Sequence, residues 1–309
     1  MTSMLVALKH RGPDSSGFAV YGEPKSGEYL MRIKVAEQED MDKGRGATTL
    51  IRDRICQIDE ILTEHNVEVK EKENITAYAL RYVISHNGDV QAMAQHIEEV
   101  GGVEILSLGS RLELVKDLGD ATIVSEQYGL SNFRGTHAIG HTRMATESDV
   151  DIRSAHPYWA FPYNDIAVVH NGQITNYWTM RREMERKGHR FMSDCDSELL
   201  AVYTANNLAN GASLSESLHS SINEIDGVFT YLVATQDQLG MAKDTMAAKP
   251  LVLYESDDFI AMASEEVAIR SILPQEIETY ENLSLLGRVT PNIYGQTNTI
   301  TGNGPTGLS

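Results

Sequence analysis

The chain has 309 residues, 41% hydrophobic and 23% charged, and its 26 basic and 44 acidic side chains give a net charge of −18. These values suit a globular protein with a buried core, and the acidic balance argues against nucleic-acid or anionic-membrane partners, which need a basic surface. With Cys56 and Cys195 as its only cysteines, the chain is expected to lack a disulfide framework and to be cytoplasmic, and no apolar run is long enough to cross a membrane.

The first 130 residues predict strands alternating with helices, judged from apolar spacing and turn residues. In chain order the predicted elements are a short helix at 4–10, strands at 18–21 and 29–35, a helix at 47–65, a strand at 75–84, a helix at 90–100, a strand at 103–108 and a short helix at 111–118. Because strands and helices alternate between 25 and 130, this range is predicted to be an α/β insertion rather than a linker.

The remaining residues are richer in strands. Helices are predicted at 177–187, 197–210 and 214–225, and strands at 137–142, 166–169, 228–234, 239–243, 250–254 and 259–264. The last four strands, separated by turn residues, favour an antiparallel sheet with one covered face. Residues 286–309 form a C-terminal tail whose Gly-, Thr- and Asn-rich end predicts disorder.

Four segments gather glycines and polar side chains at the ends of predicted strands, where a rigid scaffold usually presents functional groups. They are HRGPDSSG at 10–17, GHTRMAT at 140–146, VHNGQI at 169–174 and SDCDSE at 193–198. The histidine spacing matches no metal site, so His141 and His170 are expected to be hydrogen-bonded supports, and Cys195 a packed side chain. No metal or cofactor is expected in this chain.

These segments contain complementary groups for binding an amino acid. Arg143 offers a planar fork that suits a carboxylate, and Asp196, at the start of a predicted helix, can accept hydrogen bonds from an ammonium group. Asn171 and Gly172 can aim a side-chain amide and a backbone N–H at one point, as an oxyanion hole requires. The set therefore predicts a site for amide or acyl chemistry on an amino acid.

Each of these residues also has a purely structural interpretation. Asp196 fits an ordinary acidic helix N-terminus, and Arg143 fits a structural ion pair. Asn171 and Gly172 form a dipeptide typical of a hairpin turn, and residues 11–14 are an ordinary turn by composition. Only the combination of the segments and their order favours the functional interpretation.

The order HRGPDSSG, GHTRMAT, HNGQITNY, SDCDSE resembles the glutaminase domain of class II glutamine amidotransferases, which have an N-terminal-nucleophile hydrolase fold; the segments KDTMAAKPL at 243–251 and ASEE at 263–266 add to the likeness. The resemblance covers residues 1–24 and 131–270. It implies an α+β fold: a four-layer αββα sandwich formed by residues 1–24 and 131–285, with 25–130 inserted and the first strand missing. No cofactor is implied for this domain.

Carried over to this sequence, the resemblance assigns Arg143 to the α-carboxylate of glutamine and Asp196 to its α-amino group. It assigns Asn171 and Gly172 to the oxyanion hole, and places Arg11 and Gly12 in a turn beside the nucleophile. In the family, a terminal cysteine thiolate attacks the side-chain amide with its own α-amine as base, and ammonia leaves.

The family's opening Cys-Gly-Ile strand has no counterpart ahead of Arg11, so the chain as written is expected not to hydrolyse glutamine. Two interpretations stay open: the natural protein begins further upstream, or the subunit binds glutamine or glutamate without catalysis, as a regulatory or structural component. A third, proteolysis, fits less well because a peptide bond lacks the free α-carboxylate that Arg143 would bind.

The stretches GVEILSLG and EQYGLSNFRGTHAIGHTRMATES resemble the stand-alone amidotransferase subunit of archaeal-type glutamate synthases and of N-methylglutamate synthase. This likeness implies a cytoplasmic complex in which the chain delivers ammonia to a flavin-binding synthase subunit beside a third synthase subunit. FMN and an iron–sulfur cluster are then expected on the partner subunits.

Overall fold

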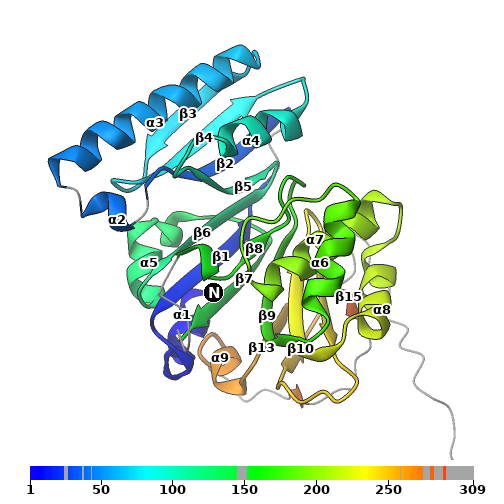
Figure 1. The fold of residues 1–309 in the computed structure, drawn as a ribbon. Helices are drawn as coiled ribbons and strands as arrows, with labels where there is room; N and C mark the ends of the chain where they lie inside the picture. The colour runs from blue at the N-terminus through cyan, green and yellow to red at the C-terminus, as the bar shows by residue number, and fades with distance from the viewer. Residues whose placement is uncertain are drawn as a thin grey trace, which may run out of the picture.

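The computed structural model describes residues 1–23, 27–36, 38–42, 44–144, 152–257, 259–273, 279–281 and 288–289. Its core consists of two antiparallel sheets that lie face to face between two groups of helices (Figure 1). The first sheet has the order β6 (Leu112–Leu118), β1 (Ser15–Tyr21), β7 (His137–Arg143). The second has the order β15 (Arg288–Val289), β11 (Leu239–Lys243), β10 (Gly227–Ala234), β9 (Ala167–Ile174), β8 (Tyr158–Trp159).

Alternating side chains on β1 form the layers on either side of the first sheet. Phe18 and Val20 pack outward in an apolar cluster with α1 (Thr2–Ala7) and α5 (Ala121–Gln127). Ala19 and Tyr21 point the other way, into the core shared with the second sheet. This period-two pattern places one sheet against helices on one face and against the other sheet on the opposite face.

The second sheet is covered on its outer face by α6 (Tyr177–Arg186), α7 (Asp196–Ala209) and α8 (Leu214–Glu224). Val168 of β9 and Phe229 and Tyr231 of β10 pack with these helices, whereas Ala167 and Val169 join the core between the sheets. The order helix, sheet, sheet, helix confirms the predicted four-layer αββα sandwich.

A smaller sheet lies beside α1. It contains β13 (Ile260–Ala263), β12 (Val252–Glu255) and β14 (Tyr280–Glu281), and α9 (Glu266–Arg270) follows β13. An apolar cluster of α1, strand and α9 side chains joins these parts; its members include Met4, Leu8, Val252, Ala261 and Ile269. The four strands predicted between 228 and 264 therefore exist, but they are shared between two sheets instead of forming one meander.

The inserted segment forms its own sheet, in the order β3 (Glu68–Asn74), β4 (Ala79–Ser85), β2 (Glu28–Lys34), β5 (Glu104–Gly109). Helices α3 (Arg45–Glu64) and α4 (Val90–Glu98) cover one face through an apolar core, and the short α2 (Gln38–Met41) precedes α3. The other face carries buried charges, among them Arg32, whose Nε donates to Glu113 Oε2 of β6 at 2.7 Å.

Two predictions about the insertion need correction. Residues 112–118, predicted as a short helix, are strand β6, which pairs along its whole length with β1. Strand β3 was not predicted, because all seven of its residues are exposed and mostly charged. The boundaries 25–130 stay a proposal, but the pairing of β6 with β1 favours ending the insertion near residue 110.

Beyond Arg288–Val289, the predicted tail lies outside the described residues, so its disorder stays a prediction. Within the described ranges, no helix combines the length and the apolar character needed to span a bilayer. In the same ranges, no three His, Cys, Asp or Glu side chains gather in a way that could hold a metal ion.

Candidate functional site

The turn before β1 packs directly against the end of β7. Gly12 has φ of +143°, and a Cβ built there would lie 2.1 Å from the backbone nitrogen of Met144. Asp14 N–H donates to the Arg143 carbonyl at 3.1 Å, and the Thr142 hydroxyl donates to the Gly12 carbonyl. Only glycine permits this contact, so the turn holds the two residues that follow Thr142 in place.

The Asn171–Gly172 pair lies inside strand β9 and not in a turn. Asn171 faces Thr230, and Gly172 faces Phe229, in the antiparallel register with β10. A Cβ at Gly172, where φ is +144°, would lie 2.0 Å from the Val228 carbonyl oxygen. The hairpin-turn interpretation is therefore wrong, and the glycine serves a close approach between two strands.

Three histidines, here called the histidine cluster, lie where the two sheets meet: His141, His156 and His170. His141 Nε2 lies 3.0 Å from Asn171 Oδ1, which links β7 to β9. The ring centroids of His141 and His156 are 4.3 Å apart, and His170 Nδ1 lies 2.9 Å from the Ser197 hydroxyl oxygen. His141 and His170 are thus hydrogen-bonded supports, as predicted.

Burial keeps this cluster neutral. It lowers the pKa of His141 to about 4, and the Asn171 hydrogen bond offsets only part of that effect. Burial likewise lowers the pKa of His156 and of His170, although the carboxylate of Asp196 acts on His170 in the opposite direction. Neutral imidazoles can hold a neighbouring amide in one orientation without adding charge to the site.

Asp196 begins α7 and lies beside His170. Its Oδ2 accepts from the backbone N–H of Ile174 at 2.9 Å, and its Oδ1 lies 3.9 Å from His170 Nδ1. The carboxylate therefore lies at the start of a helix and contacts both β9 and the histidine cluster, and its role toward a ligand stays a prediction. Buried Glu198 holds the preceding loop by accepting from the backbone N–H groups of Met192 and Ser193, each at 2.7 Å.

The two predicted arginines differ in their partners. Arg143 donates from Nη1 to the Ser154 carbonyl oxygen at 2.7 Å, in the short helix η3 (Ile152–Ser154). Arg11, at the end of η1 (Lys9–Arg11), donates from Nη1 to Glu265 Oε1 at 2.8 Å. Glu265 belongs to the ASEE segment, so that segment fixes the turn that carries Arg11 and Gly12.

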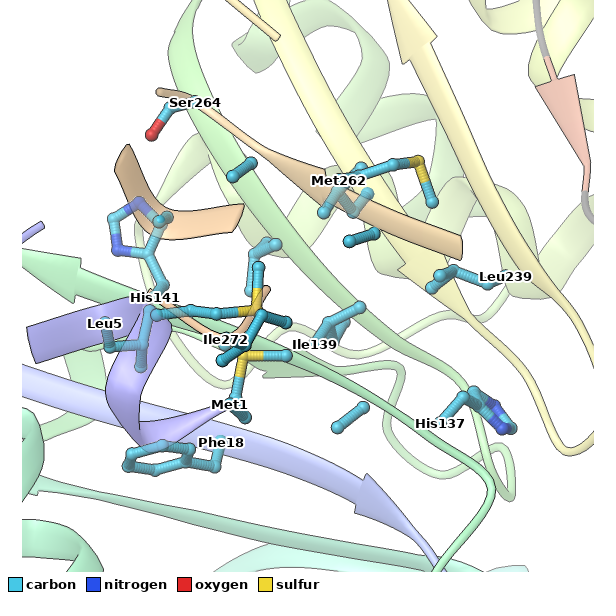
Figure 2. A pocket seen from close by; sticks show the side chains of 18 of the residues that line it. Met1, Leu5, Phe18, His137, Ile139, His141, Leu239, Met262, Ser264 and Ile272 are labelled. Atoms are coloured by element: carbon cyan, nitrogen blue, oxygen red, sulfur yellow. The ribbon is translucent and has the colours of Figure 1, made fainter. Parts of the chain in front are cut away.

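A cavity of about 1140 Å³ opens between β7 and β13 (Figure 2). Arg11, His141, Thr142, His170 and Asn171 line one end, and most of its remaining lining is apolar. Its lining includes six consecutive residues from the β7 side, 137–142, and six from the β13 side, 259–264. Both faces of each strand contribute, so the cavity runs along the backbone edges of the strands.

The structure places two of the six predicted site residues in the lining of the cavity and the other four next to that lining. Arg11 and Asn171 line the cavity, and the carbonyl of Gly12 accepts a hydrogen bond from the hydroxyl of Thr142, which also lines it. Arg143 and Gly172 are not lining residues but directly follow the lining residues Thr142 and Asn171, and Asp196 lies 3.9 Å from the lining residue His170. Arg143 and Asp196 act electrostatically on the histidine cluster.

Sequence reasoning missed His156 and Tyr158, which bring further polar groups to the site. Their rings meet edge to face with centroids 5.0 Å apart, and both side chains are buried. Burial strongly raises the pKa of the Tyr158 hydroxyl, and the Cys195 thiol adds to the rise. In the sequence only the proximity of residues 156–158 to the GHTRMAT segment hints at this role.

The neutral histidines predict a pH dependence of stability. His141 has a folded pKa of about 4 against 6.5 unfolded, so its contribution is complete above pH 6.5 and is lost as pH falls toward 4. Burial raises the pKa of Glu98 to about 7, so the contribution of Glu98 to stability increases as the pH falls below 7. We therefore expect the stability difference between wild type and His141→Gln, from urea denaturation, to shrink by roughly 1–2 kcal/mol between pH 7 and pH 5. An equal difference at both pH values would contradict this.

Comparisons with known proteins show which sequences this chain resembles. A family described as "Glutamine amidotransferase domain" matches residues 141–271, which run from β7 to just beyond α9. A protein of Methanothermobacter thermautotrophicus named "Putative glutamine amidotransferase" is 37% identical over 292 residues, covering 91% of this chain and 93% of that protein. The glutamine amidotransferase-like protein GlxB of Rhizobium meliloti is 32% identical, and the match covers 87% of this chain and 84% of GlxB.

Among solved structures, the fold is similar to that of glutamine phosphoribosylpyrophosphate amidotransferase from B. subtilis, with a TM-score of 0.53 and 18% identity. The match covers 88% of this chain and 40% of that one. At this identity the likeness concerns the fold alone, and it agrees with the αββα sandwich seen here.

Proposed function

Because this chain belongs to the class II glutamine amidotransferase family, we propose that its site binds free L-glutamine and stabilises the reaction that releases the side-chain ammonia. In the proposed chemistry, the thiolate of a terminal cysteine that is not among residues 1–309 attacks the side-chain amide carbon, and the amide C=O becomes an oxyanion. The α-amine of that cysteine, which took the thiol proton, passes it to the amide nitrogen; the C–N bond then breaks, ammonia leaves, and water hydrolyses the remaining thioester to glutamate. The residues described here supply the binding groups and the oxyanion hole for that sequence of steps.

One observation carries the proposal: the orientation of the Asn171 amide at the polar end of the cavity. His141 Nε2 is 3.0 Å from Asn171 Oδ1, so in the tautomer with a proton on Nε2 it donates to that oxygen. The Asn171 NH₂ group is then the end left to donate into the cavity that Asn171 lines. The backbone N–H of Gly172 is proposed as the second donor, next along the strand.

The charged ends of glutamine are assigned to two residues that adjoin the cavity lining, Arg143 next to Thr142 and Asp196 next to His170. Arg143 is proposed to bind the α-carboxylate and Asp196 the α-amino group. Both groups have an electrostatic effect on the histidine cluster, Arg143 on His141 and His156 and Asp196 on His170, which supports a position close to one site. Arg11 and Gly12 are proposed to form the turn beside the nucleophile.

The partners are a further part of the proposal. We propose that ammonia passes to a glutamate-synthase-type assembly with a flavin-binding subunit and a third subunit, which would hold FMN and an iron–sulfur cluster. What supports this is the sequence likeness at GVEILSLG and at residues 126–148. The second candidate is a noncatalytic subunit that binds glutamine or glutamate; ammonia release by a form with a verified terminal cysteine separates the two.

The binding proposal has a direct test in Arg143→Ala. Loss of a charged pair to the α-carboxylate is expected to weaken L-glutamine binding by about 2 kcal/mol, roughly thirtyfold, in isothermal titration calorimetry. Arg134→Ala is the matched control, because Arg134 is exposed and donates to the backbone carbonyls of Ser131 and Phe133. Unchanged affinity in Arg143→Ala would remove the α-carboxylate assignment.

A further inference from the structure

We infer that Lys116 is a positioning residue for glutamine binding: with Glu104 of the insertion it holds helix η3, whose Ser154 carbonyl fixes the guanidinium of Arg143. The inference rests on the proposed function, because it takes Arg143 to be the α-carboxylate ligand. It gives the inserted sheet a role at the site, through side chains that sequence patterns did not single out.

The first contacts run from the insertion to η3. Lys34 and Glu104 face each other across strands β2 and β5, with Nζ and Oε2 3.1 Å apart. Lys116 Nζ of β6 lies 3.6 Å from Glu104 Oε1 and donates to the Arg153 carbonyl at 3.3 Å. Arg153 Nε lies 3.9 Å from Glu104 Oε2, so the same carboxylate reaches η3 directly as well.

The last contact reaches the site. Ser154 follows Arg153 in η3, and its carbonyl accepts the Arg143 Nη1 hydrogen bond at 2.7 Å. A displacement of the Arg153 carbonyl therefore moves the next carbonyl, which holds the guanidinium. Lys116 Nζ also lies 5.3 Å from the centre of the Tyr158 ring, beside the histidine cluster.

The burial of these charges favours a positioning role over a purely stabilising one. Lys34 is 1% exposed, Lys116 5% and Glu104 7%. Burial would raise the pKa of Glu104, but Lys116 and Lys34 together lower it, so the carboxylate stays charged. A buried ion pair is often no more stable than well-packed apolar side chains of the same volume. What apolar side chains cannot supply is a donor to the Arg153 carbonyl.

The test uses Lys116→Met and two ligands that differ only at the group that Arg143 would bind. L-glutamine carries the α-carboxylate, and L-glutaminamide carries a neutral amide in its place. We expect Lys116→Met to weaken L-glutamine binding about tenfold in calorimetry and to leave L-glutaminamide within about twofold. In an Arg143→Ala background, Lys116→Met should have no further effect on L-glutamine, since the residue that it positions is gone.

Arg32→Met is the matched control. Glu113 holds Arg32 and Arg81 as Glu104 holds Lys34 and Lys116, so each variant removes one of two cations bound to a buried carboxylate. Arg32→Met should lower the thermal midpoint but keep the ratio of the two affinities. Should Lys116→Met not fold, Glu104→Gln, which keeps the side-chain volume, is expected to show the same selective loss.

The outcomes separate the two proposals. Equal weakening of both ligands, the same selective loss in Arg32→Met, or no change in Lys116→Met would overturn the positioning role. If Arg143→Ala weakens L-glutamine while Lys116→Met does not, the positioning role alone falls. If Arg143→Ala has no effect, the α-carboxylate assignment falls and the positioning role falls with it.

Discussion

Replacing Gly12 with alanine is expected to abolish measurable glutamine binding and to destabilise the fold by about 3 kcal/mol or more. The backbone of Gly12 has φ of +143°, and the added Cβ would lie 2.1 Å from Met144 N and 2.4 Å from the Arg143 carbonyl carbon. Neither neighbour is a flexible side-chain end, so relief requires the end of β7 to move. That movement would displace Arg143, the proposed carboxylate ligand.

Gly188→Ala separates backbone strain from collision. Gly188 also has a positive φ, +92°, but no heavy atom lies within 4 Å of a Cβ built there. We expect it to cost about 1–2 kcal/mol in urea denaturation and to leave calorimetric glutamine binding unchanged. Gly12→Ala with stability and affinity close to those of Gly188→Ala would show that the turn is not a tight support.

The second large effect is expected at Asp165, outside the site. Its carboxylate accepts from Ser110 N at 3.0 Å, the Ser110 hydroxyl at 2.9 Å, Arg111 N at 2.9 Å and Leu112 N at 2.8 Å. These groups form the turn at which the chain leaves the insertion and enters β6. Asp165→Ala leaves backbone donors in a buried place without an acceptor, so we expect a loss of about 4 kcal/mol.

Asp165→Asn is the control for this variant. Asparagine tolerates the φ of +58° at this position and keeps one acceptor oxygen, but its NH₂ group faces donors. We expect an intermediate loss of about 2 kcal/mol in urea denaturation. If the alanine variant loses less than the asparagine variant, the four hydrogen bonds are not what anchors the insertion.

Local pattern located most of the sandwich strands and helices, because the core strands are short apolar runs between turn residues and helices α6 and α8 bury side chains at helical spacing. It failed at β6, where residues 112–117 are all buried and three of them are charged. Leu, Glu and Lys favour helix when considered alone, and only the ion pairs to the insertion sheet make their burial in a strand possible. Strand β3 failed for the opposite reason, since a fully exposed charged edge strand has no apolar period.

The sequence pointed to the site at the positions where two backbone segments pack so closely that only glycine fits. Gly12 and Gly172 mark two close approaches of backbone to backbone, and the polar residues next to them line or support the cavity. Lys116 and Glu104 could not be found this way. Their roles depend on contacts between β5, β6 and η3. The sequence alone does not show whether a lysine is buried or exposed.

The open strand edges along the cavity have a practical meaning for recombinant work. Within the described residues, β7 and β13 each lack a strand partner on one side, and main-chain donors and acceptors there can capture any extended peptide of suitable register. Met1 itself lines the cavity, so residues appended ahead of it would start inside. A purification tag at that end is therefore expected to compete with added ligands in titrations.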